Sequence, residues 1–134
     1  MTGRIGTGRF SRRGINKVLG AGGLIAAAGR PEPVPVGVDG VGRVDQVAWG
    51  EALGHPTALA ALQHANPEVG TVQPLAEAYR RAAATEVPLL VDAGASVGRV
   101  PLPETWDLLA ADPVGWGGPG GVGVLAVRTR VRIR

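Results

Sequence analysis

Two polar residues stand at positions where ligand chemistry is common. Asp92 ends the apolar run 88–91, and Asn66 closely follows the apolar run 58–62. A carboxylate at the end of a buried strand loses hydration unless a cation or hydrogen-bond donors meet it. Asp92 is therefore a candidate ligand-binding residue, and the alternative is a structural aspartate that is satisfied by the protein itself.

Other catalytic groups are scarce in this sequence. The chain contains no cysteine and one lysine, Lys17. It therefore offers no thiol nucleophile, disulfide or thiolate metal site. His55 and His64 are nine residues apart, without a third ligand at metal spacing, so we predict no metal site.

The elements that would position Asn66 and Asp92 can be predicted from residues that typically begin or end helices and from apolar runs. Asp45 can serve as a helix N-cap, and Gly54 is expected to end that helix in a left-handed conformation. Pro74 fits the first turn of a second helix. The apolar runs 58–62 and 87–91 predict strands buried on both faces.

Four other segments carry weaker patterns. The alternating valines at 34, 36 and 38 predict a short strand that ends in a turn at Asp39 and Gly40. We expect a helical turn at 106–110, a buried strand at 122–128 and partial helix over 15–28.

Strands alternating with helix-sized segments predict βαβ units. The expected fold class is thus α/β, with an incomplete, largely parallel sheet and flanking helices. In such sheets ligands bind at the carboxyl ends of the strands, where Asn66 and Asp92 both fall.

The 134 residues leave room for one compact domain. We divide the chain into a basic Gly/Arg-rich arm (1–32), a folded domain (33–128) and a basic tail (129–134). Since no run of about 18 apolar residues occurs and the small-residue stretch 18–28 is broken by glycines, we predict neither a membrane span nor a secretory signal. The expected location is cytoplasmic.

Charge is unevenly distributed around a net +3. Residues 1–31 carry six basic and no acidic side chains, residues 32–112 hold all eleven acids, and four arginines follow from Arg128 onward. Basic ends can hold a phosphate polymer, but solvated termini have the same pattern. Phe10 is the only aromatic residue before Trp49, which leaves no series of aromatics for base stacking, so nucleic-acid binding is the less favoured interpretation.

Four blocks of the chain resemble a known family: residues 64–74 (HANPEVGTVQP), 88–93 (PLLVDA), 96–101 (SVGRVP) and 116–128 (WGGPGGVGVLAVR). Their order and spacing are similar to those of the cysteine desulfurases. These are class V aminotransferases, which are fold type I enzymes dependent on pyridoxal phosphate. The resemblance covers about residues 33–128 and implies part of the large domain of that fold.

The resemblance also implies a cofactor site. The family's aspartate in the Val-Asp-Ala block binds the pyridine nitrogen of pyridoxal phosphate, and it corresponds to Asp92. Its negative charge keeps that nitrogen protonated, so the ring withdraws electrons from the substrate. The asparagine near the cofactor's phenolic oxygen corresponds to Asn66.

The rest of the family's machinery is replaced. The Ser-x-His-Lys segment aligns with residues 112–115, so the phosphate-binding serine and histidine become Asp112 and Val114, and the Schiff-base lysine becomes Gly115. The glutamine after the Val-Asp-Ala block is Ala95, and the ring-stacking histidine has no equivalent because no histidine precedes His55. A carboxylate about 4 Å from a phosphate is repulsive by up to about 4 kcal/mol under moderate screening.

The resulting hypothesis is a catalytically defective fragment, similar to a cysteine desulfurase, that has no catalytic residue and does not hold pyridoxal phosphate by itself. One alternative is a regulatory or complementing subunit that forms a homo- or hetero-oligomer with a desulfurase-like chain, because a partial sheet leaves unpaired edges. The other alternative is nucleic-acid binding through the basic termini.

Overall fold

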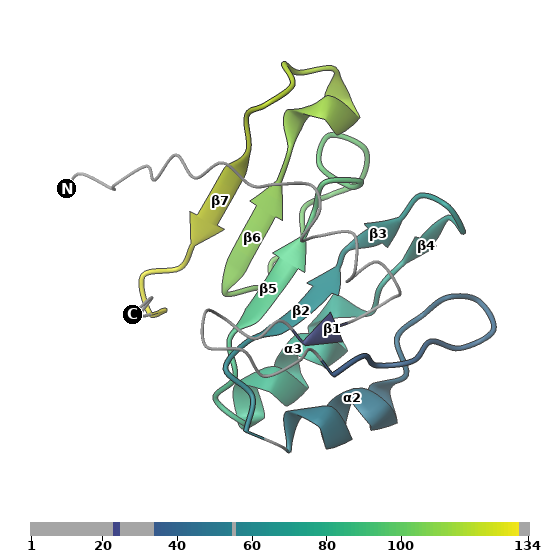
Figure 1. Ribbon diagram of the computed structural model, residues 1–134, viewed down its shortest axis with the longest axis vertical. Helices are drawn as coiled ribbons and strands as arrows, with labels where there is room; N and C mark the ends of the chain where they lie inside the picture. The colour runs from purple at the N-terminus through teal and green to yellow at the C-terminus, as the bar shows by residue number, and fades with distance from the viewer. Residues whose placement is uncertain (1–22, 25–33, 55, 132–134) are drawn as a thin grey trace.

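A five-stranded sheet forms the centre of the molecule (Figure 1). The computed structural model describes residues 23–24, 34–54 and 56–131. Along the sheet the strands run in the order β1 (Gly23–Leu24), β2 (Ala60–Gln63), β5 (Leu89–Asp92), β6 (Leu108–Ala111) and β7 (Val124–Val127). The three inner strands are parallel, whereas β1 and β7 pair antiparallel to their neighbours. The expected α/β class with a largely parallel sheet is confirmed.

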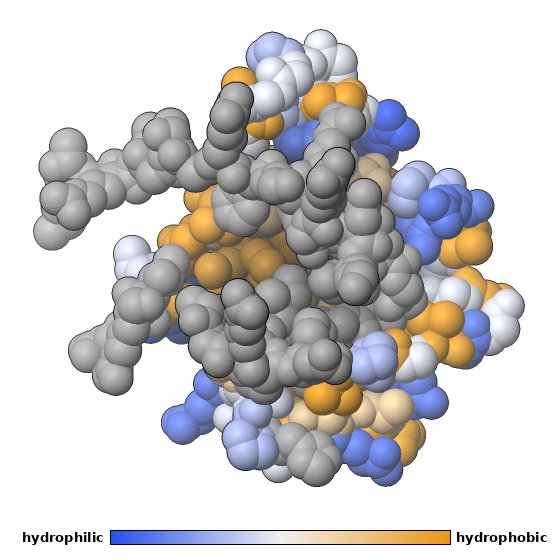
Figure 2. Space-filling model, in the orientation of Figure 1, coloured by the Kyte–Doolittle hydropathy of each residue, from blue (hydrophilic) through white to orange (hydrophobic). Residues whose placement is uncertain are grey.

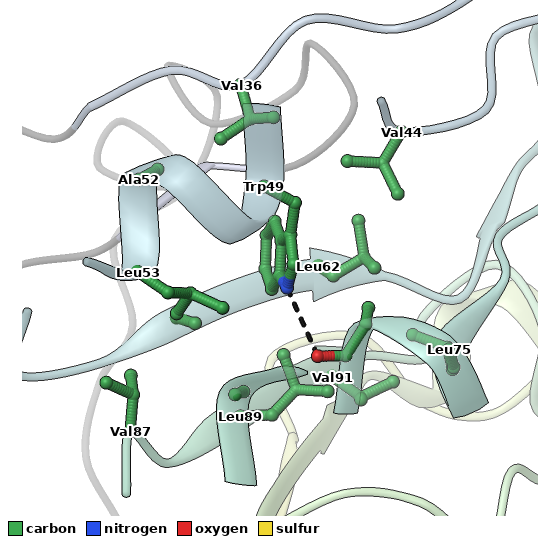
Figure 3. Close-up of a cluster of buried hydrophobic side chains, with 13 residues drawn as sticks. Val36, Val44, Trp49, Ala52, Leu53, Leu62, Leu75, Val87, Leu89 and Val91 are labelled. Carbon is green, nitrogen blue, oxygen red and sulfur yellow. Dashed lines mark hydrogen bonds between the residues drawn. The ribbon is translucent and has the colours of Figure 1, made fainter. Parts of the chain in front are cut away.

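Two helices bury one face of this sheet. Ala60 and Leu62 of β2 and Leu89 and Val91 of β5 alternate toward the side on which α2 (Gln46–Leu53) and α3 (Leu75–Ala84) pack. Trp49 fills the centre of this layer with no exposed surface (Figure 3). Its indole Nε1 donates to the carbonyl oxygen of Ala78 at 3.1 Å, which joins the two helices.

The start of α2 is the one the sequence predicts. The Asp45 carboxylate accepts from the backbone N–H groups of Val47 and Ala48 at 2.9 and 3.1 Å. The end of α2 differs, because Gly54 has φ −72° and ψ −13°. The expected left-handed conformation at Gly54 is therefore wrong. The Gly54 N–H instead closes a right-handed turn on the carbonyl oxygen of Glu51.

Helix α3 follows Pro74 as expected. Leu75, Ala78 and Ala82 are buried at helical spacing against the sheet layer. On its outer side Glu77 forms ion pairs with Arg80 and Arg81. The amphipathic pattern thus sets both the position and the orientation of this helix.

A small hairpin beyond β2 was not predicted. It consists of β3 (Ala65–Asn66) and β4 (Thr71–Val72), which pair antiparallel. The side chain of Gln73 anchors its base, because the Gln73 amide accepts from Val44 N–H at 2.8 Å and donates to the carbonyl oxygen of Gly42 at 2.7 Å.

The segment 106–110 is not a helical turn. Residues 108–111 form β6 between β5 and β7, with Leu109 and Ala111 buried. Five residues are too few for periodicity to separate a strand from a helical turn. The two neighbouring strands decide the outcome, because they satisfy the backbone of β6 on both edges.

Two other strand predictions need correction. The valines at 34, 36 and 38 form no strand of the sheet: only Val38 makes an isolated bridge, to Val44, around the expected turn at Asp39. The strand predicted at 122–128 exists as β7, but three of its four residues are exposed rather than buried. It lies at the edge of the sheet, where one side lacks a neighbour among the described residues.

The predictions for the first 33 residues fall mostly outside the described ranges. Of the segment 15–28, only Gly23 and Leu24 are described, and they form β1 rather than helix. No helix in the described ranges is long and apolar enough to cross a bilayer.

Candidate functional site

The carboxyl ends of β2, β5 and β6 meet at one edge of the sheet. Asp92 is opposite Gln63 on one side and opposite Ala110 on the other. Three turns leave this edge next to one another: the β3–β4 hairpin with Asn66, the turn 93–96, and η1 (Pro113–Trp116). The fold therefore brings together the strand ends that carry Asn66, Asp92 and Gly115.

Asp92 is half-buried and bound to its own turn. Its Oδ1 accepts from the backbone N–H of Gly94 at 2.9 Å. The backbone carbonyl oxygen of Asp92 accepts from the N–H of His64 at 2.7 Å, which fixes the strand end beneath the carboxylate. The hydrogen bond from Gly94 supports the structural interpretation of Asp92, and the second carboxylate oxygen accepts no hydrogen bond from the residues that the structure describes.

The side-chain oxygen of Asn66 also accepts a hydrogen bond within its own turn. Its Oδ1 accepts from Glu68 N–H at 2.9 Å, and its backbone carbonyl oxygen accepts from Gly70 N–H at 2.9 Å. Asparagine side chains commonly initiate turns in this way. The residue therefore holds the β3–β4 hairpin in the described structure.

Gly115 lies against the turn that follows Asp92. A Cβ atom at position 115 would lie 2.6 Å from the carbonyl oxygen of Gly94, closer than real Cβ atoms approach backbone oxygen. On its other side, the carbonyl oxygen of Gly115 accepts from Arg99 Nε at 3.1 Å and from Arg99 Nη2 at 2.5 Å. The backbone here is held from two directions and leaves no space for a side chain.

Two carboxylates lie close to Gly94, those of Asp92 and Asp112. The Cβ position of Gly94 would be 3.3 Å from Asp92 Oδ1 and 3.8 Å from Asp112 Oδ2. Asp112 Oδ1 accepts from Val114 N–H at 3.0 Å and so caps η1. A phosphate placed against this cap would meet a carboxylate where the family has a hydroxyl donor.

His64 is a buried residue next to Asp92, to whose backbone carbonyl oxygen its N–H donates. Its side chain is 7% exposed, and its Nδ1 has no hydrogen-bond partner among the described residues. Burial lowers the pKa of His64 below its ordinary value of 6.5. Within the described ranges no group of three His, Asp or Glu side chains could hold a metal ion. His55 and Lys17 lie outside those ranges.

Sequence reasoning missed two residues that shape this edge. Arg99 clamps Gly115 from 16 positions away, and Gly94 supplies the oxygen that excludes a side chain there. Glycines at positions 94, 98 and 115 indicate that two backbone segments can approach closely there. Which backbones approach one another depends on pairing between β5 and β6, which the sequence pattern does not specify.

The comparisons with known proteins identify the family. The family model for aminotransferase class V matches residues 29–133. The chain belongs to the class V aminotransferase family. Enzymes of this family depend on pyridoxal phosphate.

The relatives include cysteine desulfurases. The chain is 38% identical over 96 residues to the cysteine desulfurase IscS of Anaeromyxobacter dehalogenans, an alignment that covers 69% of this chain and 24% of the relative. It is 36% identical over 104 residues to the mitochondrial cysteine desulfurase of Arabidopsis thaliana, with 75% and 22% covered. The chain thus spans about a quarter of the length of these curated relatives.

Solved structures give the same picture. A NifS-like protein superimposes with a TM-score of 0.69 at 30% identity, with 75% of this chain and 29% of that chain covered. DndA from Streptomyces lividans superimposes with a TM-score of 0.60 at 37% identity, with 67% and 26% covered. The expected likeness to part of a fold type I enzyme is therefore confirmed.

The residues at this edge do not fit covalently bound pyridoxal phosphate. The described ranges contain no lysine, so no described side chain offers an amine to the cofactor's aldehyde. The Cβ position of Gly115 is blocked by the carbonyl oxygen of Gly94, and the phosphate side carries Asp112. The Asp92 carboxylate has the charge that a protonated pyridine nitrogen would require, but it supplies no covalent link.

Proposed function

We propose that this chain is a catalytically silent member of the cysteine desulfurase-like branch of the class V aminotransferases. The observation that carries the proposal is the 2.6 Å approach of the Gly94 carbonyl oxygen to the Cβ position of Gly115. At the position that aligns with the family's Schiff-base lysine, the chain lacks both the amine and the space for one. Asp92 and Asn66 then serve the turns that they cap, and the assignment of both residues as cofactor ligands is not part of the proposal.

Electrostatics support the same proposal. The family's cofactor carries a phosphate, and Asp112 presents its carboxylate beside the turn where a phosphate-binding donor would stand. Two like charges about 4 Å apart at moderate screening repel by up to about 4 kcal/mol, nearly a thousandfold in affinity. Non-covalent retention of the cofactor at this edge is therefore disfavoured as well.

The test is covalent trapping of the cofactor. The purified chain is incubated with pyridoxal phosphate, reduced with borohydride and weighed by mass spectrometry. The expected result is no stoichiometric mass increase and no release of sulfide from L-cysteine. Stoichiometric trapping that disappears in Lys17→Arg would contradict the proposal, because Lys17 would then act as the missing amine.

A pair of lysine variants distinguishes a site that lacks only the amine from a site that also lacks room for a lysine side chain. Gly115→Lys is expected to trap no cofactor and to lower stability, because its Cβ collides with the Gly94 carbonyl oxygen. Gly120→Lys is the matched control, since no atom lies within 4 Å of its Cβ position. Stable folding and specific trapping by Gly115→Lys would show that the site lacks only the amine.

A second candidate function is a complementing or regulatory subunit that joins an intact desulfurase-like chain. It is favoured by β7, a strand at the edge of the described sheet whose Val124, Leu125 and Val127 side chains are exposed. Co-purification of a tagged chain with a full-length cysteine desulfurase tests it, and the absence of any mixed complex at micromolar concentration would reject it. Binding of nucleic acid has less support, because two of the arginines at the C-terminal end of the described ranges bind protein groups: Arg128 binds the carbonyl oxygen of Trp106, and Arg130 of the tail binds the Asp107 carboxylate.

A further inference from the structure

The sheet has a second face that no described helix covers. Helices α2 and α3 pack on the face of Leu62 and Val91, and the residues that alternate with these point to the other side. The apolar residues of this second face are Ala61, Leu90, Leu108, Ala110, Leu125 and Val127. None of them belongs to either cluster of buried hydrophobic side chains in the described ranges. Because parallel strands are normally covered on both faces, the second face requires a cover.

Burial of the second face decreases from β2 toward β7. Ala61 in β2 is 5% exposed, and Leu90 in β5 and Leu108 in β6 are half-buried. Leu125 and Val127 in β7 are 47% and 37% exposed. Hydrophobic surface is visible in the region of β6 and β7 in Figure 2. Because these exposures are those of a single chain, its own residues must cover the β2 side of the second face.

The position of β1 indicates which part of the chain reaches that side. Gly23 pairs with Ala61 and Leu24 pairs with Ala60, in antiparallel orientation. The chain before Gly23 therefore continues toward Gln63 and the carboxyl ends of the strands, whereas the chain after Leu24 leaves toward their amino ends. The residues that precede Gly23 thus start next to the most buried side of the second face.

Two polar side chains of the second face are complementary to the same segment. The Nε2 atom of Gln63 is buried and has no hydrogen-bond partner among the described residues, and a buried donor requires an acceptor. Asp92, opposite Gln63, is the only charged residue that β2, β5, β6 and β7 place on this face. Residues 1–22 carry five basic side chains and no acidic one. Their charge is therefore opposite to that of the face.

The segment before Gly23 also has the composition and the length to cover this face. Val18 and Leu19 supply apolar side chains, and Lys17 is the only lysine of the chain. Lys17 precedes Gly23 by six residues, which can span about 20 Å. Asp92 lies about 12 Å from Gly23, because it is two strands across and two residues further along the sheet. The segment can therefore reach both the apolar part of the second face and Asp92.

We propose that residues 15–22 lie across the second face, with Val18 and Leu19 against Leu90 and the Lys17 ammonium beside the Asp92 carboxylate. The segment is then an intramolecular cover that occupies Asp92 from this side of the sheet. An ammonium in an ion pair is protonated and is no nucleophile, so the same contact keeps the only lysine of the chain from reacting with an aldehyde. The cover is tested without pyridoxal phosphate, so it does not depend on whether the chain binds the cofactor.

Zero-length cross-linking tests the ion pair, because the chain has a single lysine. A carbodiimide joins an amine to a carboxylate that it contacts, and peptide mass spectrometry locates the new amide. The expected main product of Lys17 is a link to Asp92 within one chain. Asp92→Asn should abolish this product, whereas Glu68→Gln, at an exposed carboxylate, should leave it unchanged. The proposal would be overturned if Lys17 coupled to Glu68 as readily as to Asp92 or formed no cross-link at all.

Thiol labelling tests the apolar contact, because the chain has no cysteine of its own. Leu90→Cys is expected to react at least about tenfold faster when Val18→Asp and Leu19→Asp are added, since the charged segment no longer covers it. Leu89→Cys is the matched control, because Leu89 is buried on the helix face and its thiol should stay protected unless the chain unfolds. Equal labelling of Leu90→Cys with and without the two aspartates would overturn the proposal. Protection that appears only when a full-length desulfurase is added would also overturn it and would support the second candidate function.

Discussion

At the scale of single residues, His64 is a buried titratable group beside the sheet edge described above. Its imidazole is 7% exposed, and burial lowers its pKa below 6.5. The described structure therefore favours the neutral ring, whereas the unfolded chain exposes the ring to water. Protons then bind the unfolded state more strongly as the pH falls.

This difference predicts a loss of stability in mild acid. Above pH 6.5 the ring is neutral in both states and the free energy of unfolding is at its full value. Below pH 6.5 it should fall by up to about 1.4 kcal/mol per pH unit until the lowered pKa of the folded state is reached. Urea denaturation between pH 7.5 and 5 measures the effect. His64→Gln should lose this dependence and His55→Gln should keep it, so the reverse result would contradict the assignment to His64.

At the scale of elements, α2 shows how a short helix depends on its surroundings. A helix of eight residues is marginal in isolation. Asp45 satisfies two of its first N–H groups, and Trp49 anchors it between the sheet and α3 (Figure 3). The cap is encoded locally, whereas the anchoring of Trp49 depends on the chain 29 residues away.

The cap should have a measurable effect on stability. Asp45→Ala is expected to lower the free energy of unfolding by about 1 kcal/mol, because the N–H groups of Val47 and Ala48 lose their acceptor. Asp45→Asn should retain most of the stability, since an amide oxygen also caps. Chemical denaturation of the three proteins checks this, and equal losses in both variants would show that the carboxylate charge matters more than the cap.

At the scale of the whole molecule, Asp107 connects distant parts of the chain. Its side chain is 10% exposed, its Oδ2 accepts from Leu89 N–H at 3.0 Å, and its Oδ1 is 2.7 Å from Arg130 Nη2. Arg130 also lies over the ring of Tyr79 in α3, 5.6 Å from its centroid. The start of β5, the start of β6, α3 and the chain after β7 are thereby joined. The segment 129–134 was expected to be a basic tail, and at Arg130 it is bound to the folded domain.

Removing the carboxylate should therefore cost more than removing the arginine. Asp107→Ala leaves the buried N–H of Leu89 without an acceptor and is expected to lower the free energy of unfolding by about 3 kcal/mol. Arg130→Ala should cost about 1 kcal/mol, because the Arg130 side chain is 54% exposed. Thermal and urea denaturation measure both. A larger loss in Arg130→Ala than in Asp107→Ala would contradict this account.

Local signals in the sequence predicted part of this architecture. The Asp45 cap, Pro74 at the start of α3 and the strands predicted from the apolar runs around β2 and β5 each depend on neighbouring residues, and the structure confirms them. Burial on both faces is correct for most of β2, whereas Leu90 in β5 is only half-buried. The strand β6 and the β3–β4 hairpin were missed, because such short segments depend on pairing with partners elsewhere in the chain. The sequence also predicted that Asp92 and Asn66 lie at strand ends. It did not predict the turns whose N–H groups donate to their side-chain oxygen atoms.

The sequence by itself determined the identity of the groups available: glycine rather than lysine at position 115, aspartate at position 112 and no thiol anywhere in the chain. These facts are covalent and independent of folding. Only the tertiary structure decided that position 115 has no room for a side chain and that β7 has a free edge among the described residues. The physical reason is that steric exclusion and strand pairing arise between segments distant in sequence, once β5, β6 and β7 lie side by side in the sheet.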